Sequence, residues 1–288
     1  MSSAENLSLR TAVIGHVEWV QFLRVVDVPS TGDIVHASSG WTEPAGGGPG
    51  AAVQLMKLAG DATFFTALGD DDIGHRAEAE LKAKGLDLRV AWRDEPTRRA
   101  FTHVDDRGER TITVLGDRLG PHGADDLGWD DLAEMDCVFF TAGDEAAVHA
   151  ARKARVLVAT SRAIHLLAKT HVELDALVGS STDPAEAYSP GDLDPPPRVV
   201  VWTAGSNGGT WSLNEDGEVH GFPAPPLPGP IVDRYGAGDS FAGGLTYALG
   251  AGYPAERAVA LAARCGVAVL TGRGPFDGQL EAEPKLDP

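Results

Sequence analysis

The chain has 288 residues, and its 42 Asp and Glu residues outnumber its 24 Lys and Arg residues, so the formal net charge is −18. This acidic balance argues against nucleic acid as the main partner, because a phosphate backbone is bound by a basic face, whereas backbone amides can still bind a small anion. The two distant cysteines suggest no disulfide framework or CxxC metal site, and without a signal-peptide pattern or a membrane-spanning apolar run the protein is expected to be cytoplasmic.

Short apolar runs and helical patterns alternate over the first 85 residues. Residues 11–15 and 62–69 are apolar runs that end at glycine, which is typical of buried strands. A glycine-rich loop leads into a helical pattern that ends at Gly60, and acidic residues at 70–72 begin another that ends at Gly85. This alternation predicts an α/β fold with a mostly parallel sheet that is covered by helices on both faces.

Residues 86–115 have a different pattern, with partial period-two alternation and turn residues. The pattern predicts a β-hairpin. We expect this hairpin to form a small β appendage together with part of residues 17–45. The predicted lid therefore spans about 17–45 and 88–115.

The second half of the chain resumes the alternation of strands and helices. Three more apolar runs predict buried strands at 135–143, 154–160 and 198–205, and helical patterns lie at 145–153 and 162–170. Residues 208–223 predict a hairpin with an Asp216-Gly217 turn, and 237–270 is mostly helical, with Pro254 suited to a first helical turn. No internal repeat or domain-scale linker is visible, so a single domain over 1–288 is predicted.

The segment "GAGDS" at 236–240 concentrates small residues around one carboxylate, directly before a helical pattern. The start of a helix presents free N–H groups and the positive end of the helix dipole, and glycines let an anion approach the backbone closely. Gly236, Ala237 and Gly238 are therefore interpreted as an anion cradle. Asp239 is either the N-cap of the helix or a catalytic base beside the bound anion.

Five segments, in order along the chain, resemble the ribokinase-like (PfkB) carbohydrate kinases. "GGGPGAAVQLMKLAG" resembles the glycine loop and helix of the N-terminal signature, and "DRYGAGD" at 233–239 resembles the C-terminal signature D-T-x-G-A-G-D. Between them, "ALGDDDIGHRAEAELKAKGLDL", "EPTRRAFTHVDDRGERTI" and "VVVWTAGSNGGTW" resemble the family's G-x-D-x-x-G segment, lid hairpin and V-T-x-G-x-x-G turn. The resemblance implies a three-layer, Rossmann-like α/β fold with a small β-sheet lid.

The resemblance also implies ATP-dependent phosphoryl transfer to a hydroxyl group of a small sugar. Asp239 would accept or orient the proton of that hydroxyl, and the backbone N–H groups of Gly236, Ala237 and Gly238 would hold the developing charge. No GK[ST] element of the Walker type is present.

Nucleotide and metal contacts follow from the same resemblance. The predicted nucleotide residues are Asp233, Arg234, Thr203, Gly205, Gly208 and Cys265, the last in a helix whose small residues either border the adenine or only pack against another helix. Arg234 either contacts a nucleotide phosphate or forms a salt bridge with a lid carboxylate. The family's N-x-x-E motif, which organises Mg²⁺ largely through water, is "DPAE" here, so Asp183 and Glu186 are the expected metal residues. Some relatives bind K⁺, for which "TGRGPFDG" at 271–278 is the candidate segment.

The acceptor residues of the family pattern are altered. Val20 stands where an aspartate usually binds sugar hydroxyls, and Ala51 replaces the usual asparagine of the glycine loop. The predicted substrate residues are instead Glu18, Trp19, Gly46, Gly47 and Gly48, together with Asp239. Trp19 either stacks on the acceptor or packs in the core.

The sequence is compatible with alternative functions. A nucleoside kinase and a non-catalytic ligand-binding protein share the expected fold. A serine hydrolase with Ser240 as nucleophile lacks a later histidine, and the loose dinucleotide fingerprint at 46–51 does not follow the first strand. A homodimer that pairs through the lid is expected, because the lid strands leave edges that need cover.

Overall fold

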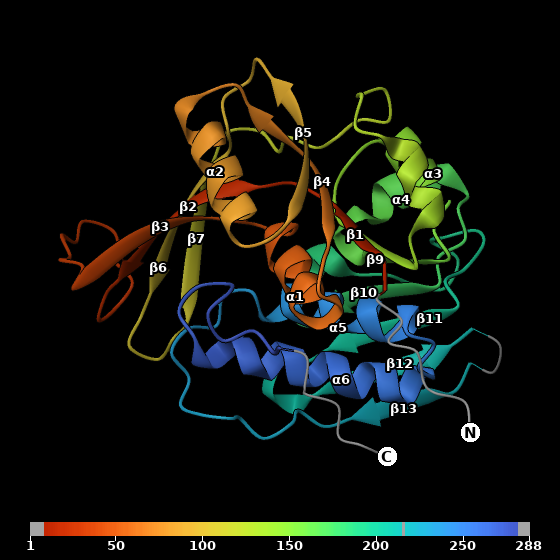
Figure 1. The fold of residues 1–288 in the computed structure, drawn as a ribbon. Helices are drawn as coiled ribbons and strands as arrows, with labels where there is room; N and C mark the ends of the chain where they lie inside the picture. The colour runs from red at the N-terminus through yellow and green to blue at the C-terminus, as the bar shows by residue number, and fades with distance from the viewer. Residues whose placement is uncertain (1–8, 215–216, 282–288) are drawn as a thin grey trace.

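Two β-sheets form the frame of the computed structural model, which describes residues 9–214 and 217–281 (Figure 1). The large sheet has the strand order β13-β12-β11-β10-β9-β8-β1-β4-β5, and its strands are parallel except for β12 and β13. Its strands are β1 (Thr11–Ile14), β4 (Thr63–Gly69), β5 (Asp87–Arg93), β8 (Cys137–Phe140), β9 (Val156–Thr160), β10 (Ala176–Ser180), β11 (Val199–Thr203), β12 (Gly209–Leu213) and β13 (Val219–Phe222). Asp216 of the predicted hairpin turn lies outside the described residues.

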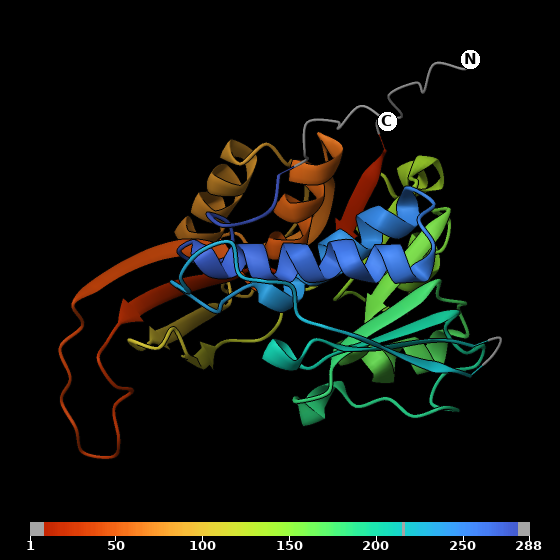
Figure 2. The ribbon, with the colours of Figure 1, turned by 90° about the horizontal axis from the view of Figure 1, so that it is seen from below.

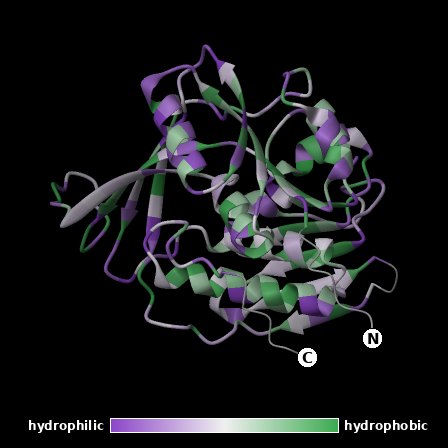
Figure 3. Cartoon of the chain, viewed as in Figure 1, coloured by the Kyte–Doolittle hydropathy of each residue, from purple (hydrophilic) through white to green (hydrophobic). Residues whose placement is uncertain are grey.

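Helices cover both faces of the large sheet, so the predicted three-layer α/β fold is confirmed. One layer contains α1 (Pro49–Ala59), α2 (Asp72–Ala83), α5 (Ala237–Gly250) and α6 (Ala255–Ala268), and the other contains α3 (Glu145–Ala151) and α4 (Ile164–Thr170). Figure 2 shows the long α6 lying across the first layer, and Figure 3 shows that it is far more apolar than the hydrophilic α2. None of the helices in the described ranges is long and apolar enough to cross a membrane.

The period-two alternation of the strands explains why two helical layers are needed. Val13 and Phe139 point into the core that contains α1 and α5, whereas Ile14 and Phe140, the next residues, point into the core that contains α3 and α4. All four side chains are buried. A parallel strand that is apolar on both faces is stable only when both faces are covered.

The small sheet is the lid. It has the order β3-β2-β6-β7 and is formed by β2 (Glu18–Arg24), β3 (Ser39–Ala45), β6 (Arg99–Val104) and β7 (Arg110–Leu115). The loop between β2 and β3 extends away from the large sheet (Figure 2). The lid has its own apolar cluster, in which Phe22 stacks on Trp41 and meets Tyr235 edge-on. Because Tyr235 directly precedes the start of α5, this cluster joins the lid to the predicted anion cradle.

The predicted lid boundary at 88 is wrong. Residues 87–93 form β5, which pairs in parallel with β4 at the edge of the large sheet. Leu88 and Ala91 are buried against the large-sheet cores, and this burial outweighs the local hairpin pattern. The carboxylate of Asp71 accepts hydrogen bonds from the backbone N–H groups of Gly74 and Thr97 and so holds the segment after β5 in place. The chain enters the lid after Thr97, where β6 begins.

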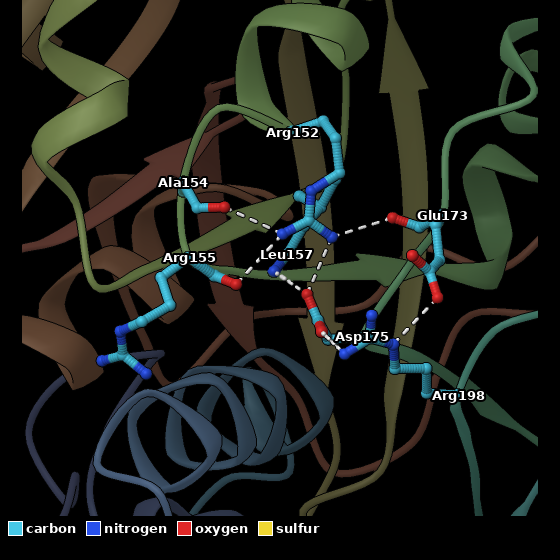
Figure 4. A network of polar contacts seen from close by, with 7 residues as sticks. All are labelled: Arg152, Ala154, Arg155, Leu157, Glu173, Asp175 and Arg198. Carbon is cyan, nitrogen blue, oxygen red and sulfur yellow. Dashed lines mark hydrogen bonds and ion pairs between the residues drawn. The ribbon is translucent and has the colours of Figure 1, made fainter.

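Ion pairs close the amino ends of three neighbouring strands (Figure 4). Arg152 pairs with Asp175 at 2.8 Å, and Asp175 also accepts the N–H of Leu157 at 2.8 Å, where β9 begins. Arg198, just before β11, pairs with Glu173 at 2.9 Å. Open α/β sheets bind ligands beyond the carboxyl ends of their strands. A ligand site is therefore expected at the opposite edge of the sheet, where these strands end.

Candidate active site

Asp239 lies in the first turn of α5, where α5 meets α1. Gly236 precedes the helix with a φ of 80°, a left-handed conformation that favours glycine, and an added Cβ there would lie 2.9 Å from the Cα of Pro275. A Cβ added to Gly50 in α1 would lie 2.8 Å from the Cβ of Asp239. Farther along α5, Gly243 lies against the backbone of Ala51. The glycines therefore allow the two helices to approach closely and present Asp239 at their junction.

Burial raises the pKa of Asp239 from its ordinary 3.8 to about 7. Arg110 and Arg162 act against this rise, while the negative charges of Glu186 and Glu18 add to it. A carboxyl group with a pKa near neutrality can exchange a proton efficiently at physiological pH. The N–H groups of Ala237 and Gly238 belong to the first turn of α5 and have no intrahelical partner, and Gly238 faces open space.

Glu18 lies beside the glycine loop that precedes α1. Its Oε1 atom is 2.9 Å from Nε of Arg98 and 3.5 Å from Nε2 of His16, and both partner side chains are largely buried. Burial opposes the charge of Glu18, but the contact with His16 and the nearby positive charges of Arg98 and Arg118 hold its pKa below the usual range. Glu18 is therefore an anion at neutral pH, whereas desolvation lowers the pKa of His16.

The glycine loop packs directly on this carboxylate and its neighbours. An added Cβ would lie 3.1 Å from Glu18 at Gly46, 2.8 Å from Oγ1 of Thr141 at Gly47, and 2.4 Å from the ring of Phe64 at Gly48. All three positions therefore exclude a side chain. The ring of His16 lies under the loop, and its buried Nδ1 has no hydrogen-bond partner among residues 9–214 and 217–281.

Trp19, Val20 and Ala51 do not line this site. Trp19 is 5% exposed, belongs to the main apolar core and lies under the guanidinium group of Arg76, so of its two alternatives the structure supports packing in the core. Val20 belongs to the apolar cluster of the lid, and Ala51 is fully buried in the main core. The chain therefore has apolar packing at the two altered acceptor positions.

A large pocket of about 710 Å³ lies next to the start of α5. Thr203, Gly205 and Gly208, from the turn between β11 and β12, form one wall of this pocket, and Ala237 and Gly238 form another part. Residues of α6, including Ala263 and Gly266, line it as well. The turn, the cradle and α6 thus surround one space that is large enough for a nucleotide.

Two predicted nucleotide residues have structural contacts instead. Cys265 is fully buried and faces α5, where a Cβ on Gly244 would lie 2.7 Å from its Sγ. Asp233 is also fully buried, and its carboxylate accepts the N–H groups of Tyr235 at 2.8 Å and Gly274 at 3.1 Å. Cys265 therefore packs two helices together, and Asp233 holds the loop that leads into α5.

Arg234 lines the large pocket and also reaches the lid. Its Nε lies 3.0 Å from Oε1 of Glu109, which follows the turn between β6 and β7. The salt bridge with a lid carboxylate, one of the two alternatives for this residue, is therefore present. Arg110 of β7 donates to the backbone carbonyl of Arg234 at 3.2 Å, so the lid contacts this loop twice.

Asp183 and Glu186 both form ion pairs with Arg162. The guanidinium group of Arg162 lies 2.7 Å from Oε1 of Glu186 and also contacts Oδ2 of Asp183. Their other carboxylate oxygens accept backbone N–H groups, from Ser180 to Glu186 and from Ala185 to Asp183. Each of the four oxygens thus has a partner, and the described residues contain no group of three side chains that could hold a metal directly.

Comparisons with known proteins identify the family of the chain. A model of the pfkB family of carbohydrate kinases matches residues 9–155 and 146–282. The chain belongs to the PfkB family of carbohydrate kinases. An ATP-dependent ribose-1-phosphate kinase of Halopiger xanaduensis is 31% identical over 92% of this chain and 93% of that relative. An aminoimidazole riboside kinase of Salmonella typhimurium is 26% identical over 82% of this chain and 86% of its own.

Solved structures show the same fold for this PfkB kinase. Ribokinase from Thermotoga maritima superposes with a TM-score of 0.76 over 96% of this chain and 97% of its own, at 21% identity. Arabidopsis thaliana ribokinase, solved with ribose and ATP, superposes with a TM-score of 0.73 over 95% of this chain and 96% of its own, at 18% identity. The predicted ribokinase-like fold and family are thereby confirmed.

The serine-hydrolase alternative is wrong for this PfkB kinase. Ser240 is fully buried, and its hydroxyl accepts a hydrogen bond from Nε2 of Gln279 at 3.1 Å. A nucleophile must reach its substrate, and this hydroxyl is enclosed between α5 and the C-terminal segment. The dinucleotide alternative is also excluded, because β1 leads into the lid strand β2 rather than into the glycine loop.

Sequence reasoning missed four basic side chains near the site: His16, Arg98, Arg118 and Arg162. They come from four separate segments and resemble ordinary surface or strand residues when each is taken alone. Two weak sequence signals could have indicated these residues. Arg98 and Arg99 are adjacent within the lid motif, and Arg162 closely follows a predicted strand. Only the fold brings them together at one edge of the sheet.

Proposed function

We propose that this PfkB kinase transfers the γ-phosphoryl group of ATP to a hydroxyl group of a small sugar or sugar-like acceptor. The observation that carries this proposal is the position of Asp239. Its carboxyl group, with a pKa of about 7, stands at the start of α5, between the glycine loop of α1 and the large pocket. An acceptor hydroxyl beside Asp239 faces the pocket from which the phosphoryl group arrives.

The reaction requires one proton transfer, and Asp239 performs it. As the acceptor oxygen forms its bond to the γ-phosphorus, the carboxylate takes the hydroxyl proton, and the bond from phosphorus to the β–γ bridging oxygen breaks to release ADP. The backbone N–H groups of Gly236, Ala237 and Gly238 hold the charge that develops on the transferred group.

The large pocket is assigned to ATP. Thr203, Gly205 and Gly208 border the nucleotide on one side, and the α6 residues that line the pocket border it on the other. Arg234 stands at the phosphate end beside Ala237 and Gly238. Arg234 then has a second partner besides Glu109, so nucleotide binding is coupled to the lid.

Asp183 and Glu186 fit a Mg²⁺ ion that is bound through water, because their oxygens already have protein partners. When bound with the nucleotide, Mg²⁺ neutralises phosphate charge. For K⁺, segment 271–278 is the candidate, since Gly274 and Pro275 lie against the loop that begins α5. Removal of Mg²⁺ and omission of K⁺ in separate assays test these two assignments.

The names of the relatives do not select one acceptor, because they cover a sugar phosphate, a riboside and, in a Salmonella fructokinase, a hexose. The nucleoside alternative rests on Trp19 and on the loss of the usual aspartate and asparagine at Val20 and Ala51, and the burial of Trp19 removes the first of these grounds. A sugar remains the first choice. Glu18, held in place by Arg98 and His16, provides a carboxylate for its hydroxyl groups.

The test is ADP release with Mg·ATP and a panel of pentoses, hexoses, sugar phosphates and nucleosides. Turnover with a sugar-type acceptor supports the proposal. Binding of acceptors without turnover across the whole panel would favour the non-catalytic alternative, and turnover restricted to nucleosides would favour a nucleoside kinase.

A homodimer that pairs through the lid is part of the proposal. Strand β7 is exposed along its length, including Ile112, Val114 and Leu115, which are 41–56% exposed. An exposed apolar edge strand is usually covered by a partner. Small-angle scattering is expected to give the mass of two chains, and a monomer at assay concentration would contradict this part of the proposal.

A further inference from the structure

A second, smaller pocket of about 310 Å³ is lined by basic and neutral residues. Its charged or titratable lining side chains are Arg118, His122, Arg162 and His165, and no carboxylate is among its lining residues. Arg162 is already paired with Asp183 and Glu186, which lie outside this lining, so the positive charge that the pocket offers comes mainly from Arg118. A concave site with this lining is suited to an anion.

Arg118 is the basic group in this pocket that has no counter-ion. Within the described part of the chain, its guanidinium group makes no hydrogen bond and no ion pair, although the positive charges of Arg98 and Arg162 are near enough to act on it. The carboxylate of Glu18 is also nearby, but its Oε1 is already paired with Arg98. Burial and the two neighbouring guanidinium groups lower the pKa of Arg118. A bound anion removes this repulsion.

The small pocket adjoins the acceptor side of the active site. Thr141 lines it, and the Oγ1 of Thr141 also lies against the glycine loop, 2.8 Å from a Cβ added to Gly47. Arg118 acts on the charges of His16 and Glu18, which lie under that loop. Arg162, which also lines the pocket, is close enough to Asp239 to act on its pKa. The pocket therefore adjoins the acceptor side of the active site, and it shares no lining residue with the large pocket.

We infer that the acceptor is a sugar that already carries a phosphate monoester, and that this phosphate binds in the small pocket against Arg118 and Arg162. The inference rests on the proposed function, since it names the acceptor class of the same reaction. A guanidinium group offers a planar fork of donors that matches two phosphate oxygens. The existing phosphate is a handle and stays unchanged, while a hydroxyl elsewhere on the sugar loses its proton to Asp239 and gains the γ-phosphoryl group.

The experiment compares matched acceptors with and without a phosphate: ribose with ribose 1-phosphate and ribose 5-phosphate, and fructose with fructose 1-phosphate and fructose 6-phosphate. The wild-type kcat/KM for at least one sugar phosphate is expected to exceed that of its parent sugar by about 10²-fold or more, the size of a charge-assisted, bidentate contact. Equal kcat/KM for every pair would overturn the inference and leave the proposed function intact.

Three variants assign the effect to the pocket. Arg118→Gln is expected to reduce the ratio of the two kcat/KM values about 10-fold or more, and Arg118→Lys, which keeps the charge without the fork, to reduce it less. The control is Arg89→Gln, because Arg89 is a partly exposed residue of β5 that pairs with Asp87 and lines neither pocket. A ratio that is unchanged in Arg118→Gln would contradict the assignment to this pocket.

Two further experiments are needed. One distinguishes a phosphate on the acceptor from a free phosphate ion, and the other distinguishes failure of the phosphate pocket from failure of the proposed kinase function. Inorganic phosphate added with the parent sugar tests a free ion: if it raises the parent sugar to the rate of the sugar phosphate, the anion is not part of the acceptor. Calorimetry with the sugar phosphates in the absence of ATP tests binding alone. Absence of transfer to any acceptor would refute the proposed function, whereas binding that is lost in Arg118→Gln would still support the pocket, and absence of binding would overturn it.

Discussion

Replacing Asp239 with Asn tests the catalytic role of the carboxylate and its electrostatic state in one variant. Asn keeps the size of the side chain but accepts no proton from the acceptor hydroxyl. Turnover with Mg·ATP is therefore expected to fall by about 10²–10⁴-fold. In the wild type, turnover is expected to rise with pH through about 7 and then level off, because only the ionised carboxylate acts as the base.

The same raised pKa predicts that the stability of the wild type falls as the pH rises, whereas its turnover rises. A carboxyl group that holds its proton more tightly in the folded than in the unfolded chain makes folding less favourable as the pH rises from 3.8 towards 7. One pKa unit is worth about 1.4 kcal/mol, so the full cost above pH 7 is about 4 kcal/mol. Solvent at the half-buried side chain reduces this to about 1–3 kcal/mol. The Asn variant is expected to be more stable than wild type by this amount at pH 8, and by less than half of it at pH 5.

Urea unfolding of both proteins at pH 5, 6, 7 and 8 measures this difference, and all other titrating groups cancel in the comparison. A free-energy difference that stays constant over this range would refute the reasoning about burial. Wild-type-like turnover of the variant would refute the assignment of Asp239 as the base, whatever the stability data show.

Three further substitutions test separate parts of the structure. Gly50→Val places a side chain against Asp239, and the activity is expected to fall more than about 10-fold, whereas Gly221→Ala, which meets no atom within 4 Å, serves as the control with unchanged rates. Arg162→Gln removes a positive charge that lowers the pKa of Asp239, so the rise of kcat with pH is expected to move to higher pH, and a shift to lower pH would contradict this sign. Asp175→Ala removes the carboxylate that pairs with Arg152 and accepts the N–H of Leu157, and urea unfolding is expected to show a loss of about 2–3 kcal/mol with little change in KM; a loss below about 0.5 kcal/mol would mean that the network contributes little.

Much of the fold follows from local patterns. Apolar runs that end at glycine predicted β1 and β4, and the glycine that ends α1 at Gly60 was visible because a left-handed residue there favours glycine. β5 was assigned to the lid because its alternation resembles a hairpin. Its actual partner, β4, lies about 24 residues earlier, and only the packed structure decides between a local and a distant strand pairing.

The candidate site likewise combines features that local sequence predicts with features that only packing decides. The sequence alone predicted the reaction class through its resemblance to the PfkB family, because the motifs at 46–60 and 233–239 that carry the resemblance are contiguous segments. Only the tertiary structure decided that Trp19 and Cys265 face the core, since the direction of a side chain depends on what packs against it. Likewise, the raised pKa of Asp239 and the pocket around Arg118 arise from burial and from charges that distant segments bring together, and neither is encoded in any one stretch of sequence.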